Sequence, residues 1–96
     1  MLYMNILTWD PDKREAIMQR AAKIGFQHEG IKVLGTWVDA NGGRCFQITE
    51  VPANADPMPG LKAAYAWNDI AQIQSIGIVD AGELLKIAPQ LVAAKP

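Results

Sequence analysis

The sequence has only one cysteine and one histidine, Cys45 and His28, among its 96 residues. A lone cysteine cannot form a disulfide within the chain, and one cysteine with one histidine cannot complete a tetrahedral zinc site. The spacing of the carboxylates does not indicate a site made of acidic residues alone. We therefore expect no metal and no cofactor.

Basic clusters, long apolar runs and glycine-rich phosphate loops are also missing. The net charge is −1, and without a basic patch the chain lacks the footprint of a nucleic-acid-binding protein. No apolar run approaches the roughly 20 residues of a membrane-spanning helix, and the first residues lack the basic start of a signal peptide. These absences predict a cytoplasmic protein that binds neither nucleic acid nor membrane.

Residues 31–51 predict a β-hairpin around which the chain is organised. Two β-rich arms flank the sequence Asn41-Gly42-Gly43, which is typical of a tight turn between antiparallel strands. A loop of two or of four residues gives the same opposite neighbours: Asp39 with Arg44, Trp37 with Phe46, Gly35 with Ile48, and Val33 with Glu50.

Side chains of a strand alternate between the two faces of its sheet, so this pairing sorts the hairpin residues into two sets. The first set comprises Ile31, Val33, Gly35, Trp37, Phe46, Ile48 and Glu50. The second set comprises Lys32, Leu34, Thr36, Val38, Cys45, Gln47, Thr49 and Val51. We expect the first set to face the helices, because it is the more apolar.

The rest of the chain supplies the other elements of a single domain over residues 1–96. We predict strands over residues 2–9 and 73–79, helices over 11–24, 57–69 and 81–88, and a loose tail over about 90–96. Asp10-Pro11 and Asp56-Pro57 resemble helix starts, and Asp80 with Glu83 resembles a capping box. The resulting β-α-β-β-α-β order is the α+β ferredoxin-like unit, a four-stranded antiparallel sheet with two helices on one face.

Several short motifs also point to a known group of proteins. They are the opening Met-Leu-Tyr-Met with Trp9-Asp10-Pro11, the segment of residues 30–35 leading to Trp37, and Trp67-Asn68-Asp69. With these motifs the chain resembles an uncharacterised family of short bacterial proteins, which is similar to the dimeric α/β-barrel superfamily. The resemblance implies that two ferredoxin-like protomers join their sheets. That superfamily includes cofactor-free monooxygenases, haem-degrading monooxygenases, isomerases and non-catalytic ligand binders.

The sheet face without helices supports the same expectation of a homodimer. If it carries the second set of hairpin residues, it exposes Leu34, Val38, Cys45 and Val51, together with Tyr3, Leu7 and Trp9 from the first strand. That is a large apolar patch for a monomer, and a second copy packing sheet against sheet would cover it.

Two residues are candidates for acid–base chemistry. His28 is followed by Glu29 and could act as a general base, although neighbouring residues seldom point together and a solvated loop histidine is the commoner case. Glu50, placed on the core face beside Val33, could exchange protons with a substrate. The alternative is that it lies at the strand end and reaches water or a basic partner.

Aromatic and amide side chains are candidates for ligand binding. Gly35 beside Trp37 could leave a hollow between the sheet and the helices, and the tryptophans could line it or simply fill the core. Asn5 and Trp67 match two residues of the haem-degrading enzymes in type and order, but the haem-ligating histidine is missing. The expected ligand-binding residues are Trp37, Asn5, Trp67, Asn68 and Phe46.

The sequence therefore predicts a homodimeric module that binds a small, partly apolar ligand between sheet and helices, or that has a structural role. A cofactor-independent monooxygenase or isomerase acting in the same hollow is the alternative. A subunit that binds a partner through an exposed edge strand is a third possibility.

Overall fold

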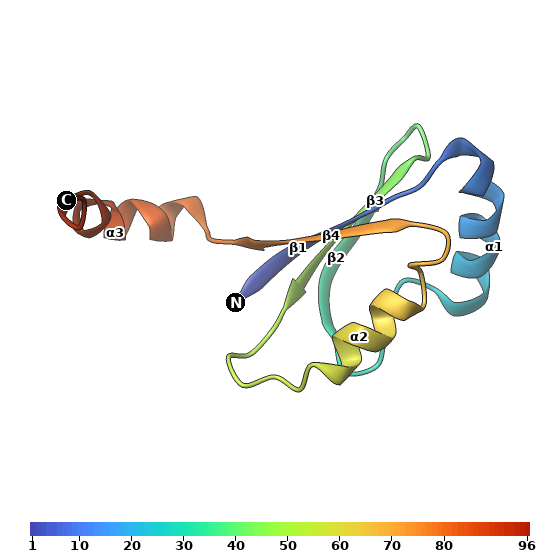
Figure 1. The fold of residues 1–96 in the computed structure, drawn as a ribbon, viewed down its shortest axis with the longest axis horizontal. Coiled ribbons are helices and arrows are strands. Elements are labelled where there is room, and N and C mark those ends of the chain that lie inside the picture. Colours follow the sequence, from blue (N-terminus) through green and yellow to red (C-terminus); the bar gives the residue numbers. More distant parts are fainter.

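A computed structural model describes all 96 residues, and it has the predicted ferredoxin-like order of elements (Figure 1). The elements are β1 (Leu2–Thr8), the short 3-10 helix η1 (Pro11–Lys13), α1 (Arg14–Ile24), β2 (Lys32–Val38), β3 (Arg44–Glu50), α2 (Met58–Tyr65), β4 (Gln72–Ile78) and α3 (Ala81–Ala93). The strands form one antiparallel sheet in the order β2-β3-β1-β4. Helices α1 and α2 lie on one side of this sheet.

The helix starts are set by different local interactions. Asp80 Oδ2 accepts a hydrogen bond from the backbone N–H of Glu83 at 3.1 Å, as the capping pattern predicts. Asp56 Oδ1 similarly accepts from the N–H of Met58 at 3.0 Å. Asp10 lies at the N-cap position before Pro11, which agrees with the predicted helix start, but its side chain makes no capping hydrogen bond, and the chain enters α1 through the 3-10 helix η1.

The conformation of the hairpin turn is set by Gly42 and Asp39. Gly42 has a φ of +76°, a conformation that side chains with a Cβ rarely adopt, and its N–H donates to Asp39 O at 2.7 Å. Arg44 Nε lies 3.2 Å from Asp39 Oδ2, which confirms the predicted cross-strand charge pair. The structure also confirms the pairs Trp37–Phe46 and Gly35–Ile48.

The predicted pairing of Val33 with Glu50 is wrong. A bulge at Leu34 shifts the register, so that Val33 lies opposite Thr49 and Lys32 lies opposite Glu50. The extra residue shifts the pairing of Lys32 and Val33 by one position relative to the rest of the hairpin, which the sequence alone does not indicate.

The assignment of the two sheet faces is also reversed. Cys45 and Thr49 are buried on the helix-covered face, whereas Trp37 is 55% exposed on the open face. The indole of Trp37 lies across Gly35, since a Cβ added to Gly35 would collide with that ring. The prediction failed because the helix-covered face borders a partly polar pocket, so it is not the more apolar of the two faces.

The true open face is largely apolar, and we call it the open sheet face. Its apolar register positions across the four strands hold Leu2, Met4, Ile6, Gly35, Trp37, Phe46, Ile48, Ile76 and Ile78, and Gln74 of β4 lies on the same face. Tyr3, Leu7 and Cys45, which we predicted there, alternate to the helix-covered face, and Trp9 is buried in the core. Both faces therefore carry apolar side chains, but the hairpin face that we predicted to be open is covered by the helices, and the one predicted to be covered is open.

The buried core is small and lies at one end of the helix-covered face. It comprises Trp9, Ile17 of α1, Cys45 of β3, and Trp67 with Ala71 from the segment after α2. Ile17 and Cys45 are each 1% exposed. The core fixes α1 and the α2–β4 connection against the sheet and leaves the remainder of this face to the pocket.

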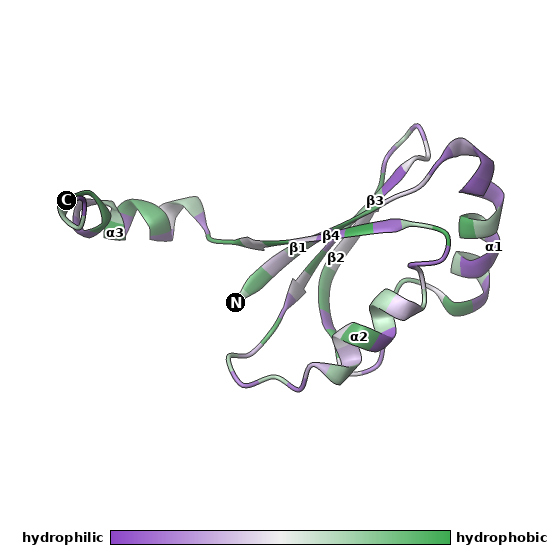
Figure 2. Cartoon of the chain, in the orientation of Figure 1, coloured by the Kyte–Doolittle hydropathy of each residue, from purple (hydrophilic) through white to green (hydrophobic).

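Helix α3 leaves the end of β4 and projects away from the body of the protein (Figure 1). It continues through Pro89 to Ala93, so the prediction that the helix ends at residue 88 is wrong, and the segment predicted as a loose tail begins inside this helix. A proline removes one helical hydrogen bond but does not always end a helix. Figure 2 shows that much of α3 is hydrophobic. Its exposed apolar side chains are Leu84, Leu85, Ile87, Leu91 and Val92. None of the helices is both long and apolar enough to span a bilayer.

Candidate ligand-binding pocket

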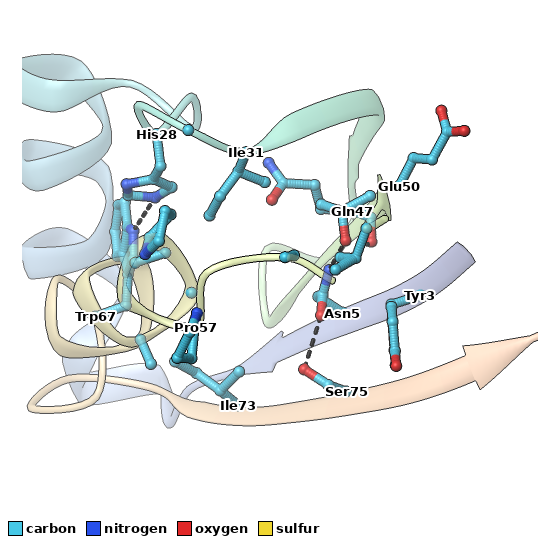
Figure 3. A pocket seen from close by; sticks show the side chains of 18 of the residues that line it. Tyr3, Asn5, His28, Ile31, Gln47, Glu50, Pro57, Trp67, Ile73 and Ser75 are labelled. Atoms are coloured by element: carbon cyan, nitrogen blue, oxygen red, sulfur yellow. Dashed lines mark hydrogen bonds between the residues drawn. The ribbon is translucent and has the colours of Figure 1, made fainter. Parts of the chain in front are cut away.

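A cavity of about 390 Å³ lies between the helix-covered face of the sheet, α2, and the loops of residues 26–31 and 51–57 (Figure 3). Its floor is formed by alternate residues of three strands: Tyr3, Asn5, Leu7, Cys45, Gln47, Thr49, Ile73 and Ser75. Its volume falls within the range of small-molecule sites, about 300–1,000 Å³.

Asn5 is the centre of a polar network on the pocket floor. Its Nδ2 donates to Thr49 Oγ1 at 2.9 Å, and its Oδ1 accepts from Ser75 Oγ at 2.7 Å (Figure 3). The network joins β1, β3 and β4, so the Asn5 amide is held in one orientation. Because its donor and acceptor already have partners, Asn5 acts mainly as a brace for the floor.

Gln47 is held by its amide nitrogen. Nε2 donates to the backbone oxygen of Phe26 at 2.7 Å and to Thr36 Oγ1 at 3.1 Å. A carbonyl oxygen only accepts, so the atom facing Phe26 must be the nitrogen. Gln47 Oε1 accepts from no group of the chain, and it is not sealed from solvent.

Phe26, Trp67 and His28 form the end wall of the pocket. The rings of Phe26 and Trp67 stack with a centroid separation of 5.6 Å and an interplanar angle of 14°. Trp67 Nε1 donates to His28 Nε2 at 3.2 Å (Figure 3). Because an indole nitrogen can only donate, His28 Nε2 must carry a lone pair, and the imidazole is neutral with its proton on Nδ1.

Burial lowers the pKa of His28 from its ordinary value of 6.5, because the charged imidazolium is disfavoured away from water. The unfolded chain therefore takes up a proton at His28 at a higher pH than the folded protein does. The contribution of neutral His28 to the free energy of unfolding is therefore complete above about pH 6.5. It decreases as the pH falls from there through the lowered pKa.

We expect the free energy of unfolding to decrease between about pH 7 and about pH 5, and the His28→Gln variant to lose part of this decrease. Denaturant titrations of both proteins at several pH values measure the two slopes. The chain has no other histidine, and the lowered pKa values of Asp39 and Asp69 place their titration below the ordinary 3.8. Equal slopes in the two proteins would contradict the assignment.

Cys45 is buried beneath the helices, and burial raises the pKa of its thiol because the thiolate is disfavoured there. A thiol with a raised pKa is a poor nucleophile at neutral pH. Cys45 therefore contributes packing to the core and the pocket floor.

The structure brings together three of the predicted site residues, Asn5, His28 and Trp67. Glu50 lies at the pocket rim (Figure 3). Its Oε2 pairs with Lys32 Nζ at 3.0 Å. Glu50 therefore lies at the strand end beside a basic partner. The predicted core position beside Val33 is wrong, because the bulge places Lys32 opposite Glu50 instead.

The other predicted residues do not reach the pocket. Trp37 and Phe46 lie opposite each other on the open sheet face. Asn68 lies outside, beside a smaller polar hollow formed with Thr8, Asp10 and Gln72. Gln47, Thr49 and Ser75 were not predicted as site residues. The available signal was the recurrence of polar residues at every second position of apolar strands.

Comparison with known proteins gives a family and a fold. Residues 1–92 match the family described as "Domain of unknown function (DUF3303)". None of the curated proteins matches the sequence. The fold is similar to the crystal structure of a Deinococcus radiodurans protein, provisionally named as an antibiotic biosynthesis monooxygenase. That similarity has a TM-score of 0.50 at 15% sequence identity and covers 83% of this chain and 93% of the other.

Proposed function

Because the chain belongs to the DUF3303 family, whose description names no activity, we propose a function from its geometry: a homodimeric module that binds a small, partly apolar molecule between sheet and helices. The observation that carries this proposal is the pocket of about 390 Å³ above the braced Asn5. Small-molecule sites are typically concave and mostly apolar, with a few fixed polar groups.

The walls of the pocket support binding of an apolar ligand surface. Leu7, Phe26, Ile31, Trp67 and Ile73 contribute aromatic and aliphatic side chains. The polar groups are arranged by bonds within the protein, so the ligand does not have to order them when it binds. A site that is organised before binding fits a ligand-binding role better than a merely incompletely packed core.

The open sheet face supports the homodimer. Its apolar residues span all four strands, and a monomer seldom leaves so extended an apolar surface in water. A second copy covers this face by isologous contact, in which the same patch meets itself across a two-fold axis. Projecting α3, with its exposed apolar side chains, gives each protomer a second unpartnered surface that such an assembly can cover.

A cofactor-independent monooxygenase or isomerase is the second candidate, favoured by the name of the Deinococcus protein with the similar fold. Such an enzyme needs a base within reach of its substrate. His28 Nε2 already accepts from Trp67, and Glu50 pairs with Lys32 at the rim. Binding therefore has the stronger support, and oxygen uptake with a bound ligand separates the two functions.

The test is native mass spectrometry of the protein purified from its own host. We expect a dimer with a retained small molecule, and we expect that molecule to be absent from Ala64→Phe, which places a ring in the pocket. Ala22→Phe, a matched change at an exposed position of α1, should keep the ligand. Wild-type protein of bare chain mass would contradict ligand retention, and loss of ligand in both variants would contradict its location.

A further inference from the structure

The pocket contains no unpaired charge. None of the residues that line it is lysine or arginine. Its two acidic residues are at the rim and already engaged, since Glu50 pairs with Lys32 and Asp56 accepts from the N–H of Met58. His28 is held neutral by the bond from Trp67. A carboxylate or phosphate entering the pocket would therefore lose its hydration without gaining a cation.

The arginines of the fold are committed elsewhere. Arg20 binds Asp69 and the backbone oxygen of Ala66, Arg44 pairs with Asp39, and Arg14 donates to the Asn41 oxygen of the hairpin turn. None of these arginines borders the pocket. The exclusion of anionic ligands therefore does not depend on the position of one flexible side chain.

The polar side chains of the floor differ in which hydrogen-bonding atoms remain without a partner in the protein. The Asn5 amide is bonded at both ends, and both N–H groups of Gln47 have acceptors in the chain. Gln47 Oε1 is left as a fixed acceptor without a partner, at an amide that extends toward the side of the pocket that holds Ile31 (Figure 3). The hydroxyl of Tyr3 can donate or accept, so it sets no preference.

We propose that the pocket selects an uncharged, mainly apolar molecule that carries a hydroxyl or N–H donor, and that Gln47 Oε1 accepts this donor. The inference rests on the proposed function, because it specifies the ligand of the same pocket. Desolvation of the unpartnered Gln47 oxygen disfavours a ligand that covers it without a donor, and the lack of cations disfavours an anion. Gln47 is then the residue that determines specificity.

Three probes of nearly equal shape test this selection by equilibrium dialysis at pH 7: 2-naphthol, naphthalene and 2-naphthoate. We expect 2-naphthol to bind about three- to tenfold more tightly than naphthalene, which corresponds to one hydrogen bond. We expect 2-naphthoate to bind more than about tenfold more weakly than 2-naphthol, because its charge stays unpaired.

Gln47→Met should bring the naphthol-to-naphthalene ratio close to one, whatever happens to the absolute affinities. Gln74→Met makes the same exchange on the open sheet face, opposite Ile6, and should keep the wild-type ratio. The wild-type ratios remain decisive even if Gln47→Met does not fold.

Equal binding of naphthol and naphthalene, or tightest binding of naphthoate, would overturn the inference and leave a ligand-binding pocket in place. No binding by any probe would count against the proposed function itself, and the inference would fall with it.

Discussion

Replacing Ile48 with glutamate is expected to separate the proposed dimer into monomers. Ile48 lies at the centre of the open sheet face, opposite Met4 of β1 and Gly35 of β2. In a two-fold dimer the substitution places two carboxylates in one interface, and burying charges without partners costs several kcal/mol. We expect the dissociation constant of the dimer to rise by at least about 100-fold.

Sedimentation equilibrium over a range of protein concentrations measures this change. Met18→Glu is the matched control, because Met18 is an apolar residue on the outer side of α1 and is 60% exposed. It adds the same charge to the helical layer and should leave the dimer intact. A wild-type protein that stays monomeric at the highest concentrations, or an Ile48→Glu dimer as tight as the wild type, would contradict the proposed assembly.

Truncating Trp67 to alanine is expected to lower the free energy of unfolding by about 3–5 kcal/mol, the range for large aromatic residues in a core. Trp67 is 2% exposed, stacks on Phe26 and donates to His28. Small domains are stable by about 5–15 kcal/mol, so the variant would lose much of its stability. Urea denaturation at one fixed protein concentration measures the change, because the proposed dimerisation would make the apparent stability depend on concentration.

Two further variants assign the source of that loss. Trp67→Phe keeps an aromatic ring but removes the N–H donor, and we expect a loss of about 1–2 kcal/mol. Tyr65→Ala, two residues earlier and 78% exposed, should change stability by no more than about 0.5 kcal/mol. If Trp67→Ala cost as little as Tyr65→Ala, Trp67 would not be part of the core.

The fold could be predicted from sequence because its signals are local. The turn at residues 41–43, the Asp39–Arg44 pair and the cap at Asp80 each depend on residues close together in the chain, and the structure contains all three. The order of strands and helices then leaves few topologies to consider. The element order, the antiparallel sheet and the similar fold confirm the ferredoxin-like class.

The site was harder to predict because it depends on which face of the sheet the helices cover. Hydrophobicity favoured the face of Trp37 and Phe46, yet the helices cover the face of Cys45, Gln47 and Thr49. The polar residues of the pocket lie on the helix-covered face. In the sequence pattern they make that face resemble a solvent-exposed one. Asn5, His28 and Trp67 were identified by residue type, whereas the free oxygen of Gln47 requires a count of hydrogen bonds in three dimensions.

The indole N–H signals of the tryptophans in a ¹H–¹⁵N NMR spectrum test the central claim most directly. Trp67 lines the pocket, whereas Trp37 lies on the open sheet face. The signals can be assigned with single Trp→Phe variants. Titration with 2-naphthol should shift the Trp67 indole signal and leave that of Trp37 in place. A shift of Trp37 with no change at Trp67 would put the ligand on the other face of the sheet and contradict the account.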